Sequence, residues 1–547
     1  MPDGPPGSER LRAPERVMCL ENLGRMFPTR LSFLRVLTRR LHAAAARVDR
    51  SVWSVDAEGY GHAVYVVEAG RETYSLVAVT QALADEDRSD RVIATSWDAA
   101  FVLYDGVPDT AETRRIVASV PLQEAGRFTE RDLVLSRANK SVRFFSHVVE
   151  RLRNGQQPDP ELLVQTGYLM RTTAVYGNGK FGIAAWERIA DRPLLAGSFM
   201  AEMLAVWLIR GFTHDLAEHL GGAAIDANLK RHLGVGNATG LGMAPFLVSH
   251  PMLIHRWFSA REEALERACA LPDLEGNTLE EARDLARRVA AHLTEWTVGD
   301  PAAMAEIEVL KDAWHDLSET HFEGGSASVD RRHLLAAAPG ATEELVAAFL
   351  IELAGGEVDG LSAAFAADEA AKLDPTMSCA ALLALAQRDW DWAVGMDWET
   401  PEAAAVFWYV SEEKLEPRLG SRVSDAGAEL ETPLDVARRV AALVADLPES
   451  DLSLAEFLLA HPQHRDAARR VQTAAALPFS EIRDNLIGGH VRPTDLLRAK
   501  LAMFGASKFD PKSDLWTRIT LVQGAPLAGE IQSARALDWW LPSMEAR

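Results

Sequence analysis

The chain has 547 residues, of which 48% are hydrophobic and 25% charged, and these are the proportions of an ordinary globular protein. A formal net charge of -22 argues against a nucleic-acid-binding protein, because phosphate contacts are made by clustered Lys and Arg. The three cysteines, Cys19, Cys269 and Cys379, lie too far apart for a metal motif or a disulfide framework, which indicates a reducing compartment.

The N-terminal part of the chain is polar at first and then locally basic. Residues 1–14 are rich in Pro, Gly and charge and contain no apolar run of signal-peptide type, so we expect a disordered tail. In residues 30–42, apolar side chains recur at helical spacing between arginines. This pattern fits a helix docked on its own domain, which we expect, or a helix that binds a membrane surface or a partner.

The clearest strand signals come next. Residues 62–68 and 73–79 are β-branched runs separated by the turn Ala69-Gly70-Arg71-Glu72, which predicts a hairpin. Residues 92–104 supply one more long strand or two short ones. Because the runs are closely spaced, we expect an antiparallel meander rather than parallel strands joined by helices.

From Asp109 onward, helical patterns dominate the chain. We predict helices over residues 109–120, 133–153, 161–175, 193–220, 251–270, 278–292 and 301–321. The stretch 193–220 is apolar nearly all round, apart from Glu202, and indicates a central core helix rather than a membrane span. We therefore expect a cytoplasmic protein without a transmembrane segment.

These patterns together predict a mainly α (α+β) fold, with a large helical core and a small N-terminal antiparallel β-sheet. Behind the tail, we expect an N-terminal α+β region with the meander over residues 15–125. A central helical region with Gly/Asn-rich loops would cover residues 126–325, and a C-terminal helical region residues 326–547.

Two Gly- and Asn-rich segments, residues 176–182 and 230–245, are the strongest functional signal. Their spacing fits neither a dinucleotide fingerprint nor a phosphate loop. Exposed backbone N–H groups in such segments can form an anion-binding nest, whereas the alternative is a structural loop that needs glycine for close packing. The candidate ligand-binding residues are Asn178, Lys180, Lys230, Arg231, Gly234, Gly236, Asn237, Thr239 and Gly240.

Two histidine–carboxylate clusters suggest a further possibility. The first contains His214, Asp215, Glu218 and His219, and the second contains His315, Asp316, Glu319 and His321. In each cluster a His and a Glu are four residues apart and share a helix face, so two such faces could hold a metal in a helical bundle. The alternative is a solvated face with local ion pairs. Because known metal motifs are absent from both clusters, we assign no residue to a metal.

Two aromatic or histidine-containing stretches are open to more than one interpretation. The Trp-rich residues 388–400 and 407–418 could line a pocket for a cationic or sugar-like ligand, or form a core corner beneath a loop. His461 and His464 are interpreted as part of a surface turn. A nucleophile elbow of the form G-x-S-x-G does not occur, and no Cys lies beside a His.

The sequence therefore predicts a cytoplasmic enzyme that acts on a small anionic metabolite, carboxylated or phosphorylated, bound between the two Gly/Asn-rich segments. His214 or His232 would be the acid–base group, because an unperturbed His titrates near neutrality. The reaction class and any cofactor stay unknown, and self-association into a homo-oligomer stays open. The alternatives are a non-catalytic helical scaffold or sensor that binds a partner, and a metal-dependent helical-bundle enzyme.

Overall fold

The chain forms two compact units, each built from separate stretches of sequence. The computed structural model describes residues 11–17, 22, 24–84, 97–122, 127–142, 144–176, 189, 191–237, 251–299, 301–366, 372–397, 433–477, 502–505, 508–513, 516–533 and 537–544. The first unit comprises Met1–Met26, Pro245–Glu275 and Ala327–Ala499, and the second comprises Phe27–Ala244, Gly276–Ser326 and Lys500–Arg547.

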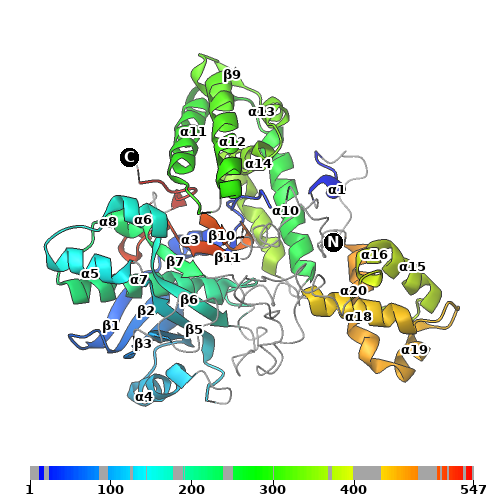
Figure 1. Ribbon diagram of the computed structural model, residues 1–547, viewed down its shortest axis with the longest axis horizontal. Helices are drawn as coiled ribbons and strands as arrows, with labels where there is room; N and C mark the ends of the chain where they lie inside the picture. The colour runs from blue at the N-terminus through cyan, green and yellow to red at the C-terminus, as the bar shows by residue number, and fades with distance from the viewer. Residues whose placement is uncertain are drawn as a thin grey trace. The chain divides into compact units, whose positions relative to one another are not determined.

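A mixed sheet organises the second unit (Figure 1), and its nine described strands run in the order β1-β2-β3-β4-β5-β6-β7-β11-β10. The strands are β1 (Arg47–Val55), β2 (Gly61–Ala69), β3 (Glu72–Thr80), β4 (Ala99–Asp105), β5 (Asp132–Lys140), β6 (Tyr168–Tyr176), β7 (Gly234–Asn237), β10 (Lys508–Ser513) and β11 (Trp516–Leu521). Strands β1 to β6 pair antiparallel in chain order, so the predicted hairpin and meander are confirmed.

The predicted fold class is wrong, because the sheet is neither small nor confined to the N-terminal region. The structure is about 55% helix and 15% strand, and its main sheet recruits strands from as far along the chain as Leu521. The predicted helices over 133–153 and 161–175 contain β5 and β6 instead. Strand β5 is buried along nearly its whole length, and a short apolar run of this kind cannot be distinguished from a buried helix by periodicity.

A glycine marks the point at which the second of these predictions fails. Helix α6 (Pro160–Thr166) ends at Gly167, whose φ of 73° lies in the left-handed region that glycine adopts at little cost. Strand β6 begins at the next residue, Tyr168. The helical pattern after Gly167 therefore belongs to a new element.

A long buried helix, α7 (Met200–Gly221), connects β6 to β7 through the short helix α8 (Ala227–His232). Leu194, just before α7, donates its N–H to Glu72 at the start of β3, whereas His219 in its last turn contacts the carbonyl of Asp56 between β1 and β2. These contacts lie at opposite edges of the sheet. Because β3, β4, β5 and β6 pair antiparallel in turn, β3 begins at the edge where β6 ends. Helix α7 therefore begins at the edge where β6 and its parallel neighbour β7 end.

The predicted burial of this helix is confirmed. Phe199, Leu204 and Trp207 are 2%, 0% and 3% exposed. One face of the sheet contacts α7, where Phe212 meets the rings of Tyr65 and Phe101. An apolar helix thus fills the layer on this side of the strands.

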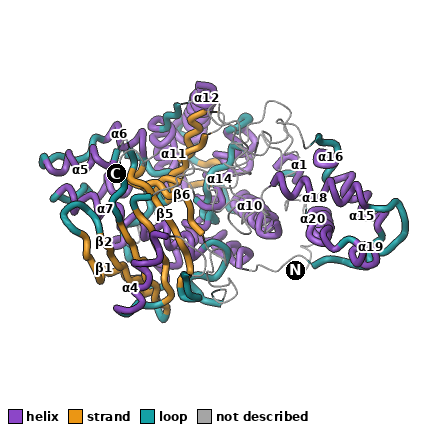
Figure 2. The backbone as a smooth tube through the Cα atoms, turned by 60° about the horizontal axis from the view of Figure 1, so that its bottom comes forward, coloured by secondary structure: helices purple, strands orange, loops and turns teal. Residues whose placement is uncertain are grey.

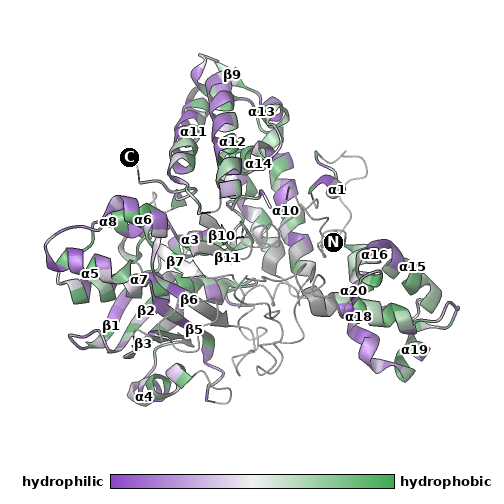
Figure 3. Ribbon diagram, viewed as in Figure 1, coloured by the Kyte–Doolittle hydropathy of each residue, from purple (hydrophilic) through white to green (hydrophobic). Residues whose placement is uncertain are grey.

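Shorter helices complete the second unit around the sheet. Besides the elements above they are α3 (Phe33–Ala43), α4 (Thr110–Ser119), η1 (Val120–Leu122), α5 (Phe145–Arg153), α11 (Gly276–Glu295), α12 (Pro301–Ser318), the π-helix η4 (Glu319–Glu323) and η9 (Ala528–Glu530). The helix predicted over 109–120 is α4, which Asp109 caps: its carboxylate accepts from the N–H groups of Ala111 and Glu112. Hydrophilic and hydrophobic residues alternate along α5 (Figure 3).

The arginine-rich helix predicted over 30–42 is α3, and it is docked on its own unit. Phe33, Leu37 and Leu41 are fully buried, and the Phe33 ring lies 5.6 Å from that of Phe199. The apolar face of α3 is therefore used within the fold rather than offered to a membrane or a partner.

The helices predicted over 278–292 and 301–321 are α11 and α12, which lie side by side (Figure 2). The Trp314 indole of α12 donates to the carbonyl of Ala286 in α11 at 3.2 Å. Farther along, the Arg283 guanidinium reaches the carbonyl of Phe322 in η4. None of the described helices combines the length and apolar character needed to cross a bilayer.

The part of the first unit that the structure describes is helical apart from one short two-stranded ladder. Its described elements are α1 (Pro14–Val17), α10 (Pro251–Ala270), β8 (Leu274–Glu275), β9 (Ser328–Val329), α13 (Arg331–Ala337), α14 (Thr342–Leu353), η5 (Gly355–Ala366), α15 (Cys379–Asp389), α16 (Asp391–Val394), α18 (Pro433–Asp446), α19 (Leu454–Ala460), η8 (Pro462–His464) and α20 (Arg465–Ala476). Helix α10 has the bounds that the sequence predicts, beginning at a favoured Pro.

A buried charge network attaches the N-terminal stretch to this unit. The Arg12 guanidinium binds both carboxylate oxygens of Glu262 in α10, at 2.8 and 2.6 Å, and also reaches Glu344 in α14. Arg261 contacts Glu344 from the other side at 2.5 Å. The side chains of Arg12, Arg261 and Glu344 are at most 2% exposed, so each charge depends on its partners for compensation. Residues 1–10 of the predicted tail lie outside the described residues.

We expect Arg12→Met to lower the free energy of unfolding of this unit by about 3–5 kcal/mol, because it leaves Arg261 as the one buried cation shared by Glu262 and Glu344 among the described contacts. Arg16→Met is the matched control, since Arg16 pairs with Glu343 but its side chain is 61% exposed. An exposed pair contributes at most about 1 kcal/mol. Urea unfolding of both variants measures the difference, and equal losses would contradict the role given to Arg12.

Candidate functional site

The first Gly/Asn-rich segment begins at the end of β6, and the second contains β7, the neighbour of β6 in the sheet. Strands β6 and β7 are parallel, and Thr172 is paired with Asn237. Parallel neighbours end at the same edge of a sheet, here called the carboxyl edge. Tyr176, the last residue of β6, begins the first segment, and Asn237, the last of β7, lies within the second. Asn178, Lys180, Thr239 and Gly240 lie outside the described residues, so a shared pocket stays a prediction.

Gly234 and Gly236 have a packing role inside β7. A Cβ on Gly236 would lie 2.8 Å from the ring of Tyr168 in β6, and one on Gly234 would lie 2.3 Å from the carbonyl oxygen of Leu521 in β11. These glycines therefore allow β7 to fit between its two neighbours. Their predicted contact with a ligand stays a prediction.

Lys230 and Arg231 already have carboxylate partners. The Lys230 ammonium lies 2.5 Å from Glu218, and the Arg231 guanidinium lies 3.0 Å from Glu530. Both cations precede β7, whereas Asn237 ends it. A four-residue strand spans roughly 10 Å, so the cations lie at the opposite end of β7 from Asn237.

His214 and His232 lie with these cations. Both are buried, at 3% and 5% exposure, and His214 hydrogen-bonds the backbone of Leu233, which follows His232. Burial, reinforced by the charges of Arg210 and Lys230, holds the pKa of His214 well below its usual range, so the imidazole is neutral at pH 7. Its Nε2 makes no hydrogen bond with any described residue.

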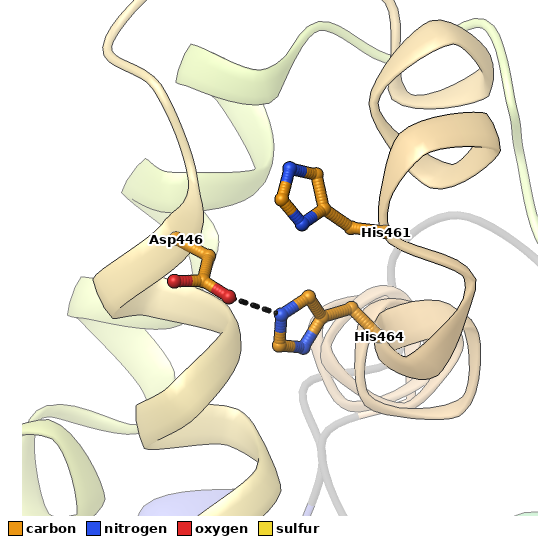
Figure 4. A group of neighbouring side chains, drawn as sticks. All are labelled: Asp446, His461 and His464. Carbon is orange, nitrogen blue, oxygen red and sulfur yellow. Dashed lines mark hydrogen bonds and ion pairs between the residues drawn. The ribbon is translucent and has the colours of Figure 1, made fainter.

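The two histidine–carboxylate clusters do not gather metal ligands. In the first, Asp215 contacts Arg50 and Tyr65, at 3.0 and 2.7 Å, while His219 and Glu218 have separate partners. The second contains the exposed pair His315–Glu319 at 3.4 Å. Within the described part of the chain, three ligand atoms come together at Asp446, His461 and His464 instead (Figure 4).

Charged side chains fix the chain where it returns to the carboxyl edge. Arg192 binds both carboxylate oxygens of Asp105, the last residue of β4, at 2.6 and 2.7 Å. Glu72, the first residue of β3, accepts from the N–H of Leu194 at 3.0 Å and from the Tyr74 hydroxyl at 2.6 Å. The stretch between Tyr176 and Arg192 is thus anchored at both ends along one edge of the sheet.

Helix α7 begins at this edge with an unusual backbone. Phe199 precedes the helix with a φ of 64°, a left-handed conformation that is costly for an aromatic residue. Its ring is held 5.6 Å from Phe33 and 4.8 Å from Phe504. Packing therefore imposes this geometry, which directs the first turn of α7 and its N–H groups to the carboxyl edge.

Glu202, in the first turn of α7, is a functional candidate that the sequence prediction missed. Its side chain is 4% exposed, and burial raises its pKa from 4.5 to about 7. A helix N-terminus favours the ionised form by about 0.3–1 kcal/mol, but the raised pKa means that desolvation outweighs it. A carboxyl group that titrates near neutrality suits general acid–base chemistry. The sequence signal that could have indicated Glu202 is a carboxylate within an otherwise apolar run, residues 194–209.

A separate cavity of about 260 Å³ lies between α11, α12 and η4. Its lining includes Arg283, Arg287, Glu280 and Glu323, which carry both signs of charge. The Arg283 guanidinium already donates to Glu280 and to two backbone carbonyls. This cavity therefore offers an anion little unused positive charge, and it is built from elements other than β6 and β7.

The Trp-rich stretch is only partly described. Trp390 is 2% exposed, which fits a core corner, whereas residues 398–432 lie outside the described residues.

No family model, curated protein or solved structure matches this chain. Function is therefore inferred from the side chains and their geometry.

We expect Glu202→Gln to change how stability depends on pH. Because the pKa of Glu202 is higher in the folded chain than its ordinary value of 4.5, its contribution is fully present below about pH 4.5 and is lost as the pH rises to about 7. Glutamine cannot ionise, so the variant should gain about 3 kcal/mol relative to the unmodified chain between pH 4.5 and pH 8.

Urea unfolding at several pH values measures this gain. Glu281→Gln, at an exposed position of α11, is the matched control and should leave the pH profile unchanged. Parallel profiles for Glu202→Gln and the unmodified chain would contradict a buried carboxyl with a raised pKa.

Proposed function

We propose that the chain is an enzyme that binds a small anionic ligand, carboxylated or phosphorylated, at the carboxyl edge of β6 and β7. The observation that carries this proposal is the parallel pairing of Thr172 with Asn237. It makes the two Gly/Asn-rich segments leave the sheet side by side. Ligands in α/β proteins commonly bind outside the carboxyl ends of parallel strands, where a helical crossover leaves room between two connections.

The N-terminus of α7 supplies electrostatic support for an anion at this edge. Aligned peptide dipoles place a partial positive charge there, and the first N–H groups of a helix point outward along its axis. Phe199 occupies the N-cap position, and its side chain makes no capping hydrogen bond. Backbone N–H groups of the neighbouring Gly-rich segments would add donors of the same kind.

Glu202 is the acid–base group in this proposal, in place of His214 or His232. His214 is twelve residues farther along α7, which is about 18 Å of helix. His232 precedes β7 and so lies near the opposite edge of the sheet. Glu202 lies in the first turn and has a pKa of about 7, raised by burial. It can therefore exchange a proton near neutral pH at the edge where the ligand would bind.

The same reasoning selects Asn237 for the decisive substitution. Its backbone pairs with Thr172 on one side and Ile519 on the other, and these ladder bonds survive removal of the side chain. We expect Asn237→Ala to weaken ligand binding about ten- to a hundred-fold, since a lost buried hydrogen bond costs roughly 1–3 kcal/mol. The melting temperature without ligand should change little.

The experiment is a thermal-shift screen with defined probes, namely inorganic phosphate and a panel of phosphorylated and carboxylated metabolites, at constant ionic strength. A binding compound should raise the melting temperature of the unmodified chain and of Asn228→Ala, an exposed asparagine in α8 used as the matched control. The shift should be lost in Asn237→Ala. A ligand whose shift survives that substitution would place the site elsewhere, and a large drop in melting temperature without ligand would indicate a structural Asn237.

A further inference from the structure

Three potential metal ligands meet in the first unit, at the junction of α18, α19 and η8. Asp446 ends α18, His461 follows α19, and His464 ends η8 (Figure 4). The donor atoms of the three side chains all lie within 4.8 Å of one another. Nε2 of His464 lies 2.7 Å from Oδ2 of Asp446.

Local sequence explains why the two imidazoles meet. Ser453 and Glu456 form a capping box that starts α19, and Pro462 takes the first position of η8, where its fixed φ suits the turn. The N–H of His464 then donates to the carbonyl of His461 at 3.1 Å. In a 3₁₀ turn, side chains three residues apart lie nearly one above the other, so the spacing His461-x-x-His464 brings both rings to one side.

Phe457 holds the two rings in similar orientations. Its ring stacks on His461 with centroids 4.7 Å apart and planes 21° apart, and on His464 at 5.9 Å and 16°. A ring stacked face to face keeps its nitrogens at the edge of the stack, where they can meet a ligand in the ring plane. The arrangement therefore limits the rotation of both imidazoles before any ion arrives.

The three side chains differ in their exposure, and this difference suits an ion that enters from solvent. The His464 side chain is 6% exposed, whereas that of Asp446 is 47% exposed, and His461 is intermediate. The inner ligand is thus fixed by its surroundings, and the outer carboxylate can adjust. A water molecule could complete the coordination sphere on the solvent side.

We propose that Asp446, His461 and His464 bind a divalent transition-metal ion of the Zn²⁺ class. Zn²⁺ binds His nitrogen and carboxylate oxygen at about 2.0–2.2 Å, so ligand atoms around it lie roughly 3.3 Å apart. Movements of about 1 Å would bring the present separations to this value. Two imidazoles with one carboxylate favour Zn²⁺, Co²⁺, Ni²⁺ or Cu²⁺ over Mg²⁺ and Ca²⁺, which prefer oxygen ligands alone.

Binding of the metal ion would replace a proton of His464 and would keep the link between His464 and Asp446. The contact between His464 and Asp446 needs a proton on Nε2, and a metal ion takes the place of that proton between the same two atoms. The ion would then link the end of α18 to the turn between α19 and α20. A simple His–Asp pair, the competing explanation, requires neither His461 nor any metal.

The test uses the full chain and Zn²⁺ alone, titrated by calorimetry at pH 7.5 after chelator treatment, with Co²⁺ absorption as a second signal. We expect one tight site. His461→Gln and Asp446→Asn should each weaken it at least roughly 100-fold, since even the loss of a residue that only hydrogen-bonds a ligand weakens metal sites ten- to a hundred-fold. His315→Gln, at an exposed His of the other unit, is the matched control and should leave the affinity unchanged.

Two further measurements make the outcome decisive. Zn²⁺ affinity should fall as the pH is lowered from 7.5 to 5.5, because protons compete for the imidazoles. Melting temperature without metal checks that each variant is folded, which matters most for the buried His464. Absence of tight binding to the folded chain would overturn the proposal. So would an affinity that His461→Gln and Asp446→Asn leave within a factor of three of the His315→Gln value.

Discussion

The buried guanidinium of Arg210 ties the middle of the chain to its C-terminal part. From the centre of α7 it donates to the carbonyls of Val522, Ala525 and Pro526, at 2.7, 2.9 and 2.5 Å. Burial lowers its pKa, and these carbonyls replace the water that the cation has lost. They belong to the turn that follows β11. The central helix therefore holds that strand where it can pair with β7, and the sheet joins segments from both halves of the sequence.

The position of the candidate site follows from this pairing of β11 with β7. With β11 on one side and β6 on the other, β7 has room only for glycine at Gly234 and Gly236. The crossover through α7 makes β6 and β7 parallel, so their two Gly/Asn-rich segments leave the same edge. The same crossover carries Lys230 and Arg231 to the other edge, where carboxylates bind them. One topological feature thus ends β6 and β7 at one edge of the sheet and leaves Lys230 and Arg231 at the other.

Two buried glutamates show how surroundings distinguish a structural carboxylate from a reactive one. Burial alone would raise the pKa of Glu344, but Arg261 and Arg12 outweigh it, and the pKa is lowered. Glu202 lies in an apolar helix, where burial dominates and raises the pKa to about 7. The first group stays ionised and holds helices together, whereas the second can exchange a proton near neutrality. This contrast, rather than burial itself, makes Glu202 the stronger functional candidate.

The sequence by itself determined the features that depend on residues close together along the chain. The hairpin of β2 and β3, the Asp109 cap, the bounds of α10 and the burial of α7 all follow from periodicity, turn residues and capping. The tertiary structure decided the rest. Strand β5 was indistinguishable from a helix because both its faces are buried by distant parts of the chain. The partners of Lys230 and the meeting of Asp446 with His461 likewise depend on long-range packing, because a local pattern shows which groups are available but not which of them the fold brings together.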